Sequence, residues 1–192
     1  MKTTTFALLF VFILSACGPA PTPTATPIPP TATVPPPTLS SPSDTQAILA
    51  GSKLPQDLEE LATETYSVSD WQQKHTLPYT IQLASNLRAT WTGGWCATTQ
   101  AILDQNLKQI TYAFSINGQP VALSQFYEWS SPWTDDSGKT WACHNLSTVV
   151  SNWPKGVTTV LRTVITFVSK INDGTSDYGP GRQTLIYTVT LP

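Results

Sequence analysis

Charged side chains are scarce in this chain of 192 residues, since Asp, Glu, Lys and Arg together make up 11% of it. An average soluble domain has about a quarter of its residues charged. The 10 basic and 12 acidic residues give a formal net charge of -2. Nucleic acids and anionic lipid surfaces are bound through clusters of Lys and Arg. The composition therefore predicts no nucleic-acid partner and no polybasic membrane segment.

Long apolar runs are also rare. The longest is "FALLFVFIL", from Phe6 to Leu14, and it follows a positive charge at Lys2. The run is too short to span a bilayer, but it has the length of the apolar core of a signal peptide. We therefore expect the chain to be exported.

The run ends in Leu14, Ser15, Ala16 and Cys17. These residues resemble the lipobox of bacterial lipoproteins, in which Leu and two small residues precede a cysteine. The resemblance implies a signal peptide of residues 1–16 and a diacylated Cys17, with the lipid holding the protein in the cell envelope, at the extracytoplasmic face of a membrane. Two or three acyl chains anchor a protein stably. The alternatives are an ordinary signal peptide with a chance cysteine, or an uncleaved anchor.

Residues 17–43 follow as a linker rich in proline and threonine, with no charged residue. Such a composition cannot form a core, and proline favours extended backbone, so we expect a stiff and disordered spacer. Residues 44–70 are transitional. Within them "PQDLEELATE", from Pro55 to Glu64, predicts a short helix, because proline and acidic residues favour a helix start. Its apolar stripe is small, so we expect this segment to be loosely attached or disordered.

Residues 71–192 have the texture of one all-β domain, with short alternating runs bounded by turn residues. Alternation of apolar and polar residues predicts strands, which fall near residues 79–83, 87–91, 110–116, 157–170 and 185–191. Asn117-Gly118 predicts a two-residue hairpin turn. Pro120 lacks an amide donor, so the returning strand is expected at a sheet edge. The run from Cys96 to Ile110 predicts one short helical insertion.

The strand signals of this domain, together with its ending "YGPGRQTLIYTVTLP", resemble the immunoglobulin-like or fibronectin-like sandwiches of bacterial surface proteins. The resemblance implies an antiparallel immunoglobulin-like β-sandwich.

Three cysteines divide into Cys17, explained by the lipid, and a pair further along the chain. Cys96 and Cys143 follow an export signal, so we expect them to form a disulfide. A zinc site would recruit His75 and His144 with these cysteines, but the spacings match no ligand pattern. We expect neither a metal nor a cofactor.

Acidic residues near turns could suggest calcium, above all in the stretch "NDGTSD" from Asn172 to Asp177 and at Asp135 with Asp136. This stretch lacks the ordered carboxylate positions of a calcium loop, so solvated turn residues are the better interpretation. Catalysis is not expected, because no nucleophile elbow is present and Glu128 is the one glutamate of the domain. A hydrolase would need His75 or His144 in a cleft beside a carboxylate and a nucleophile.

The chain has 7 tryptophans. Trp91, Trp95, Trp129 and Trp133 stand in turn-like contexts, where exposed indoles could stack on sugars or anchor a protein partner. The alternative is that they fill the core. We predict a noncatalytic, membrane-anchored surface lipoprotein for adhesion, envelope assembly or ligand binding, with a glycan or an envelope protein as partner. A carbohydrate-binding module is the first alternative, and a small envelope hydrolase the second.

Overall fold

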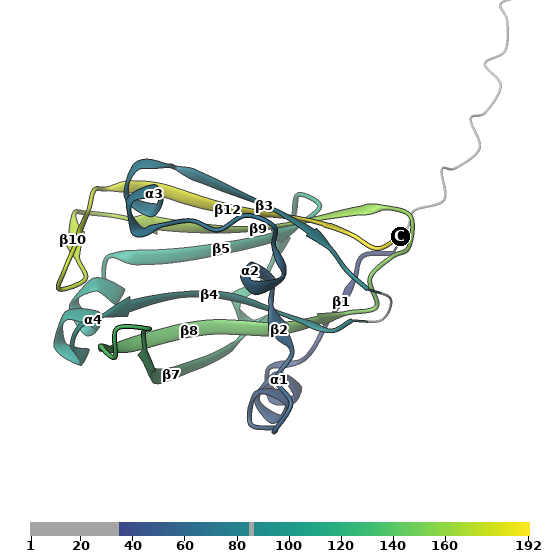
Figure 1. The fold of residues 1–192 in the computed structure, drawn as a ribbon, viewed down its shortest axis with the longest axis horizontal. Helices are drawn as coiled ribbons and strands as arrows, with labels where there is room; N and C mark the ends of the chain where they lie inside the picture. The colour runs from purple at the N-terminus through teal and green to yellow at the C-terminus, as the bar shows by residue number, and fades with distance from the viewer. Residues whose placement is uncertain (1–34, 85–86) are drawn as a thin grey trace, which may run out of the picture. The chain divides into compact units, whose positions relative to one another are not determined.

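The computed structural model describes residues 35–84 and 87–192 (Figure 1). The expected signal peptide, Cys17 and residues 18–34 of the linker lie outside the described residues. Within the described part of the chain, no helix combines the length and the apolar character needed to cross a membrane.

Two mixed β-sheets pack face to face as a sandwich (Figure 1). The first sheet consists of β1 (Thr38–Leu39), β8 (Thr140–Ser151), β4 (Ala89–Ala97) and β2 (Gln56–Asp57), with β7 (Tyr127–Thr134) paired to β8. The second consists of β3 (Thr76–Gln82), β12 (Gly181–Thr190), β9 (Thr158–Phe167), β5 (Ile110–Ile116) and β6 (Gln119–Val121). A small hairpin joins β10 (Ile171–Asn172) to β11 (Asp177–Tyr178).

Among the residues that the structure describes, four short α-helices and one 3-10 turn accompany the sheets: α1 (Pro42–Leu49), α2 (Leu58–Leu61), α3 (Val68–Gln73), α4 (Gln100–Leu107) and η1 (Leu123–Gln125). The expected helical insertion between two strands is confirmed as α4. Thr99 caps this helix, because its hydroxyl accepts a hydrogen bond from the amide of Ile102 at 3.3 Å.

The core lies between the two sheets and follows the alternation seen in the sequence. Leu185, Tyr187 and Val189 of β12 are buried, while the residues between them are half-buried. Trp91 of β4 is fully buried, and its ring packs edge-on against Phe114 of β5, with centroids 5.2 Å apart. The inward residues of both sheets therefore supply one continuous core.

The predicted hairpin between β5 and β6 is confirmed. Asn117 and Gly118 have φ angles of 49° and 79°, the left-handed conformation that a type I′ turn requires at both central positions. Pro120 lies on β6, which is the edge strand of the second sheet. On the outer side of β6, no described strand needs the amide that proline lacks.

The prediction of a purely antiparallel sandwich is wrong for two strand pairs. β3 runs parallel to β12, from Thr76 opposite Thr184 to Gln82 opposite Thr190. β2 runs parallel to β4, with Asp57 opposite Thr90. Parallel neighbours need a long connection between them, and both pairs join segments that are distant in the sequence. Local patterns therefore carried no sign of either pair.

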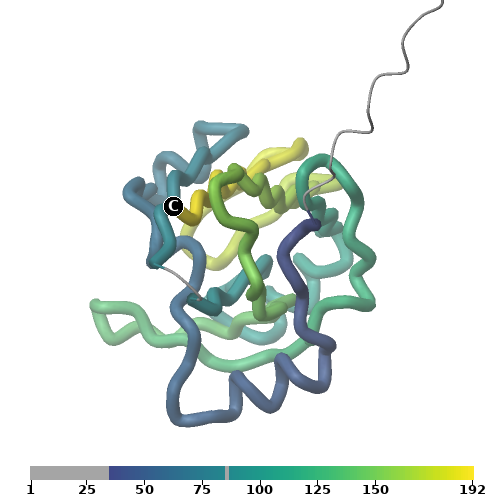
Figure 2. Tube along the Cα trace, turned by 90° about the vertical axis from the view of Figure 1, so that its right-hand side faces the viewer, coloured from purple at the N-terminus to yellow at the C-terminus, as the bar shows by residue number. Residues whose placement is uncertain are grey.

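Residues 38–70, expected as the end of the linker and a loosely attached segment, make specific contacts with the sandwich. β1 pairs with β8, and Thr45 of α1 and Leu58 of α2 are both fully buried. Figure 2 shows this segment, in purple and blue, running along the periphery of the remaining chain. The compact unit therefore includes residues well before Trp71.

Candidate functional site

A groove of about 500 Å³ runs across the edge of β4 and is the candidate functional site. Five consecutive residues of β4, from Thr92 to Cys96, line it. The groove is also lined by aromatic and acidic side chains from other elements, namely Asp57, Glu59, Trp71, Trp133, Trp141, Asp173 and Tyr178. We call it the β4 groove.

Gly93 and Gly94 of β4 line the β4 groove without adding side chains to it. A Cβ atom on Gly93 would lie 2.8 Å from the ring of Phe114, and one on Gly94 would lie 2.5 Å from Asn145 Oδ1. Both distances are shorter than side chains tolerate. Glycine is therefore required at both positions by close packing, and the edge of β4 is left without side chains there.

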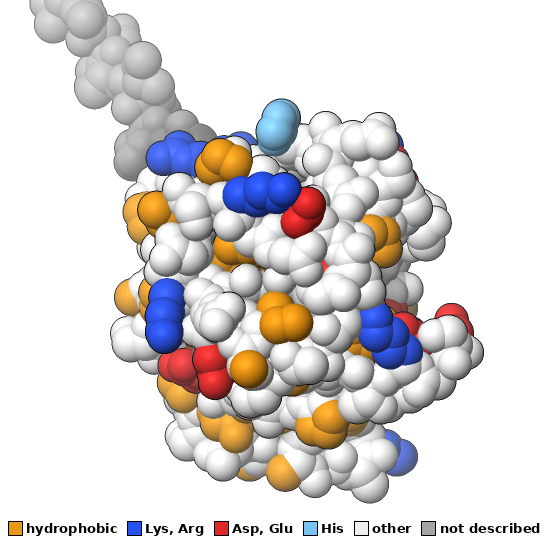
Figure 3. Space-filling model, turned by 90° about the vertical axis from the view of Figure 1, so that its left-hand side faces the viewer, with side chains coloured by type: hydrophobic (Ala, Val, Ile, Leu, Met, Phe, Trp, Pro, Cys, Tyr) orange, Lys and Arg blue, Asp and Glu red, His pale blue; other side chains and the backbone are white. Residues whose placement is uncertain are grey.

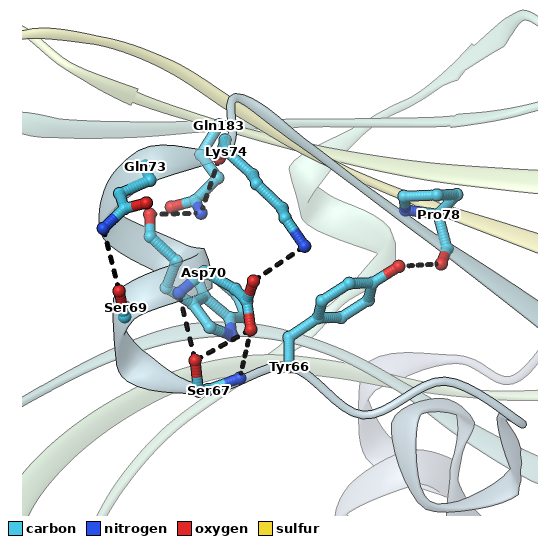
Figure 4. A network of polar contacts seen from close by, with 9 residues as sticks. Tyr66, Ser67, Ser69, Asp70, Gln73, Lys74, Pro78 and Gln183 are labelled. Atoms are coloured by element: carbon cyan, nitrogen blue, oxygen red, sulfur yellow. Dashed lines mark hydrogen bonds and ion pairs between the residues drawn. The ribbon is translucent and has the colours of Figure 1, made fainter.

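Helix α3 forms one wall of the groove through Val68 and Trp71. Ser67 caps the helix in a reciprocal capping box with Asp70, as Figure 4 shows. The Gln183 side chain of β12 donates a hydrogen bond to the Trp71 carbonyl at 2.8 Å. This hydrogen bond attaches α3, and so this wall of the groove, to the second sheet.

Asp57 and Glu59 bring two carboxylates to the groove. Asp57 Oδ1 accepts a hydrogen bond from the Glu59 amide at 3.0 Å and so caps α2. Glu59 Oε1 accepts one from the hydroxyl of buried Tyr187 at 3.0 Å, although part of the Glu59 side chain contacts solvent. Burial raises the pKa of Asp57 to about 6 and that of Glu59 to about 7. Sequence reasoning missed this pair, because its place depends on β2 pairing with β4.

The predicted tryptophans occupy different places. Trp133 of β7 is exposed over 54% of its surface and lies opposite Trp141 of β8. Trp95 is buried but lines the inner part of the groove, whereas Trp91 is fully buried in the core and does not line the groove. Trp129 is half-buried and donates its indole N–H to Ser147 at 3.0 Å.

The turn-like context expected for these tryptophans differs from the structure, which places them in strands β4 and β7. β7 contains Pro132 and, among the described strands, pairs with β8 alone, so it is an edge strand that tolerates a missing amide. Trp133 and Trp141 lie opposite each other because the β7–β8 hairpin sets them in register. Trp71 and Trp141 also line the groove and had no distinguishing signal in the sequence.

The turn between β7 and β8 is organised by Asp135. Its carboxylate accepts hydrogen bonds from the Ser137 hydroxyl, the Lys139 amide and the Trp141 indole, the last at 2.9 Å. These bonds, led by that from Ser137, lower the pKa of Asp135 to about 2. The ammonium of Lys139 lies 4.2 Å from the Trp141 ring centre. Asp135 thus holds Trp141 in place beside the groove.

Asp173, in the stretch considered for calcium, also organises a turn. Its carboxylate accepts hydrogen bonds from the amides of Thr175 and Ser176 and from the hydroxyl of Tyr178. Among residues 35–84 and 87–192, no cluster of metal-ligating side chains is found.

The expected disulfide between Cys96 and Cys143 is confirmed, with its Cα atoms 4.1 Å apart. It joins directly opposite residues of β4 and β8, and therefore two neighbouring strands of one sheet. Both sulfurs are committed to this bond, so neither ligates zinc. His75 lies just before β3 of the second sheet, whereas His144 lies on β8 of the first.

His144 lies between two side chains of β7. Its Nδ1 is 3.5 Å from the Ser130 hydroxyl, and its Nε2 is 3.5 Å from Glu128 Oε1. Glu128 and His144 line a second cavity of about 500 Å³ together with apolar side chains. Both distances are at the upper limit for hydrogen bonds. The face of the molecule drawn in Figure 3 is mostly uncharged, and its acidic and basic side chains lie in a few small groups, some with opposite charges side by side.

Comparisons with known proteins give little help. No protein-family model matches this chain, and no curated protein matches it. Among solved structures, it is similar to the Plasmodium falciparum protein Pf12p, with 7% sequence identity and a TM-score of 0.32. The similarity covers 62% of this chain and 44% of that protein. The function must therefore be argued from the site itself.

Proposed function

We propose that this chain is a membrane-anchored surface lipoprotein whose sandwich binds a partner noncatalytically in the β4 groove. The observation that carries the binding role is the exposed indole of Trp133, which stands in register with Trp141 at the rim of the groove. Large exposed aromatic side chains beside a concave apolar surface are typical anchors for a binding partner. An envelope protein is the preferred partner, which makes adhesion or envelope assembly the role.

The anchoring rests on the residues from Leu14 to Cys17 and on the apolar run before them. Cells that express the full chain would be labelled with an alkyne analogue of palmitate. We expect label on the wild-type chain and none on Cys17→Ser, while Cys96→Ser keeps the label. Equal labelling of wild type and Cys17→Ser would refute the lipid anchor.

Binding is tested with the full chain purified in detergent, screened against a glycan array and a displayed library of random seven-residue peptides. Trp133→Ala should weaken binding to any retained probe at least tenfold. Val168→Ala is the matched control, because Val168 is exposed over 65% of its surface and does not line the groove. Retention of no glycan and no peptide, or equal loss in both variants, would refute the proposal.

A carbohydrate-binding module is the second candidate. Trp129 and Trp133 lie four residues apart on β7, an even spacing, so their side chains share one face of the strand. Aromatic side chains on one face suit the apolar faces of sugar rings. Selection of glycans and no peptides in the same screen would favour this role.

An envelope hydrolase is the third candidate, favoured by the placing of His144 between Ser130 and Glu128. A serine, a histidine and a carboxylate in contact form the arrangement that activates a nucleophile. A fluorophosphonate probe would label wild type but neither Ser130→Ala nor His144→Ala if this role holds. Absence of labelling on wild type would refute it.

An immunoglobulin-like or fibronectin-like sandwich stays the finer fold proposal. The two packed sheets and the buried Trp91 support it. Its disulfide departs from the antibody pattern, in which the bond joins two sheets, because Cys96 and Cys143 belong to neighbouring strands of one sheet.

A further inference from the structure

The edge of β4 presents backbone groups to the groove in a regular order. In an antiparallel ladder, opposite residues alternate between pairs that exchange hydrogen bonds, about 5.5 Å apart at Cα, and non-bonded pairs about 4.5 Å apart. Cys96 and Cys143 have Cα atoms 4.1 Å apart, so they are a non-bonded pair. The amide and carbonyl of Cys96 therefore point away from β8, toward the free edge, as do those of Gly94 and Thr92.

Both ends of this edge are already occupied. At one end Asp57 of β2 lies opposite Thr90. At the other end the amide of Thr98 donates to the Asp173 carbonyl at 2.7 Å. Thr90 and Thr98 fall in the same alternate series as Thr92, which supports the assigned direction of these groups.

Between the two ends the edge is open. β4 pairs with β8 and β2 alone among the described strands. β2 pairs with β4 only at Ala89 and Thr90, and no described residue outside the strands forms a backbone hydrogen bond to the amide or carbonyl of Thr92, Gly94 or Cys96. We call the stretch from Thr92 to Cys96 the β4 gap. Its five residues span about 17 Å at the usual strand rise.

We propose that the β4 gap receives an extended peptide segment of a partner protein, which adds to the first sheet as a strand between β2 and Asp173. This proposal rests on the proposed binding role of the groove and names its ligand. The gap offers three donors and three acceptors at alternate residues, which matches the backbone of an extended peptide. A sugar has no such repeating pair of groups, so the edge favours a peptide.

The side chains around the gap indicate the composition of that peptide. Its inner side is apolar, lined by Trp95, Ile165 and Leu185. The charged residues that line the groove are Asp57, Glu59 and Asp173, and no Lys, Arg or His of the described chain joins them. Alternate residues of an added strand point to opposite faces. We therefore expect apolar side chains at every second position and at least one Lys or Arg near Asp57.

Amide hydrogen exchange on the free full chain tests the open edge. The amides of Thr92, Gly94 and Cys96 should exchange at least a hundredfold faster than those of Gly93 and Trp95, which bond to β8. Equally slow exchange at all five amides would show that the edge is already paired and would overturn the proposal.

Backbone methylation of a ligand tests strand addition itself on the unaltered protein. The tightest peptide from the seven-residue library is synthesised in two forms, each N-methylated at alternate residues. One form should bind at least tenfold more weakly, since its blocked amides face β4, and the other should bind like the parent. Equal binding by both forms would overturn strand addition, and so would a library that yields no binder.

A matched pair of substitutions tests the same point from the protein side. Thr92→Pro removes one edge amide without touching the β8 ladder, and Thr92→Val keeps that amide. We expect peptide binding to fall at least tenfold in Thr92→Pro and to change less than threefold in Thr92→Val. If Trp133→Ala abolishes binding while both methylated peptides bind, the groove binds a ligand but not as a strand. The two proposals therefore fail separately.

Discussion

Trp91 and Trp95 of β4 form a matched pair for testing how polar groups are satisfied in the core. Both are buried, and they lie four residues apart on the inward face of one strand. The indole N–H of Trp91 donates to Thr163 Oγ1 at 2.9 Å. That of Trp95 is buried with no hydrogen-bond partner among the described residues. Replacement by phenylalanine therefore removes a hydrogen-bonded indole N–H at Trp91 and an unpaired one at Trp95.

Trp91→Phe leaves the fully buried hydroxyl of Thr163 without its donor, which costs about 1–3 kcal/mol. Trp95→Phe removes an unpaired N–H, and this relieves a penalty of similar size. Both changes delete the same ring atoms, so their packing costs largely cancel in the comparison. We expect Trp91→Phe to lower the free energy of unfolding by about 2–4 kcal/mol more than Trp95→Phe.

The assay is denaturant unfolding of the full chain, followed by circular dichroism. Thr163→Val in the Trp91→Phe background should recover part of the loss, because it removes the unpaired hydroxyl. The reasoning is refuted if Trp95→Phe destabilises the protein as much as Trp91→Phe does.

Three further predictions follow from the described contacts. Burial holds the pKa values of Asp57 and Glu59 at about 6 and 7, above the ordinary 3.8 and 4.5. The stability that these two groups contribute to the fold is therefore complete below about pH 4 and is lost as the pH rises through 6–7. The free energy of unfolding should fall by about 1 kcal/mol from pH 4 to 8, and Glu59→Gln should make it depend less on pH. A free energy of unfolding that rises over this pH range in the wild type would contradict the prediction. Reduction of the Cys96–Cys143 bond, which closes a separation of 47 residues, should lower the free energy of unfolding by about 4 kcal/mol, measured with and without reductant; no shift would count against the pairing. Leu58→Ala should cost about 2–5 kcal/mol in thermal or denaturant unfolding, and a cost near zero would mean that α2 does not belong to the core.

Features of the fold that depend on neighbouring residues could be predicted from the sequence. The β5–β6 hairpin follows from Asn117-Gly118, and β12 follows from the alternation of Leu185, Tyr187 and Val189. The disulfide was predicted from the expected export and from the lipid expected on Cys17. In each case, the relevant chemistry is contained in a short stretch or in a count of one residue type.

The candidate site could not be predicted in the same way. Its two carboxylates reach β4 because the short strand Gln56–Asp57 pairs with β4. No local pattern in the sequence reveals this pairing. Trp133 was singled out, but the serines and Pro132 around it suggested a turn rather than an edge strand. Trp91 was misplaced because an indole beside glycines is as compatible with a packed core as with an exposed turn. In this chain Gly93 makes room for Phe114, so the glycine belongs to the core.

The parallel pairing of β3 with β12 has a mechanical consequence. A force applied at the start of β3 and at the end of β12 acts along both strands in opposite senses. The seven residue pairs from Thr76 with Thr184 to Gln82 with Thr190 are then sheared together rather than unzipped one at a time. By contrast, the two pairs that hold β1 to β8 can be peeled individually. A pull from the N-terminal side would therefore detach β1 and α1 first and leave the sandwich closed.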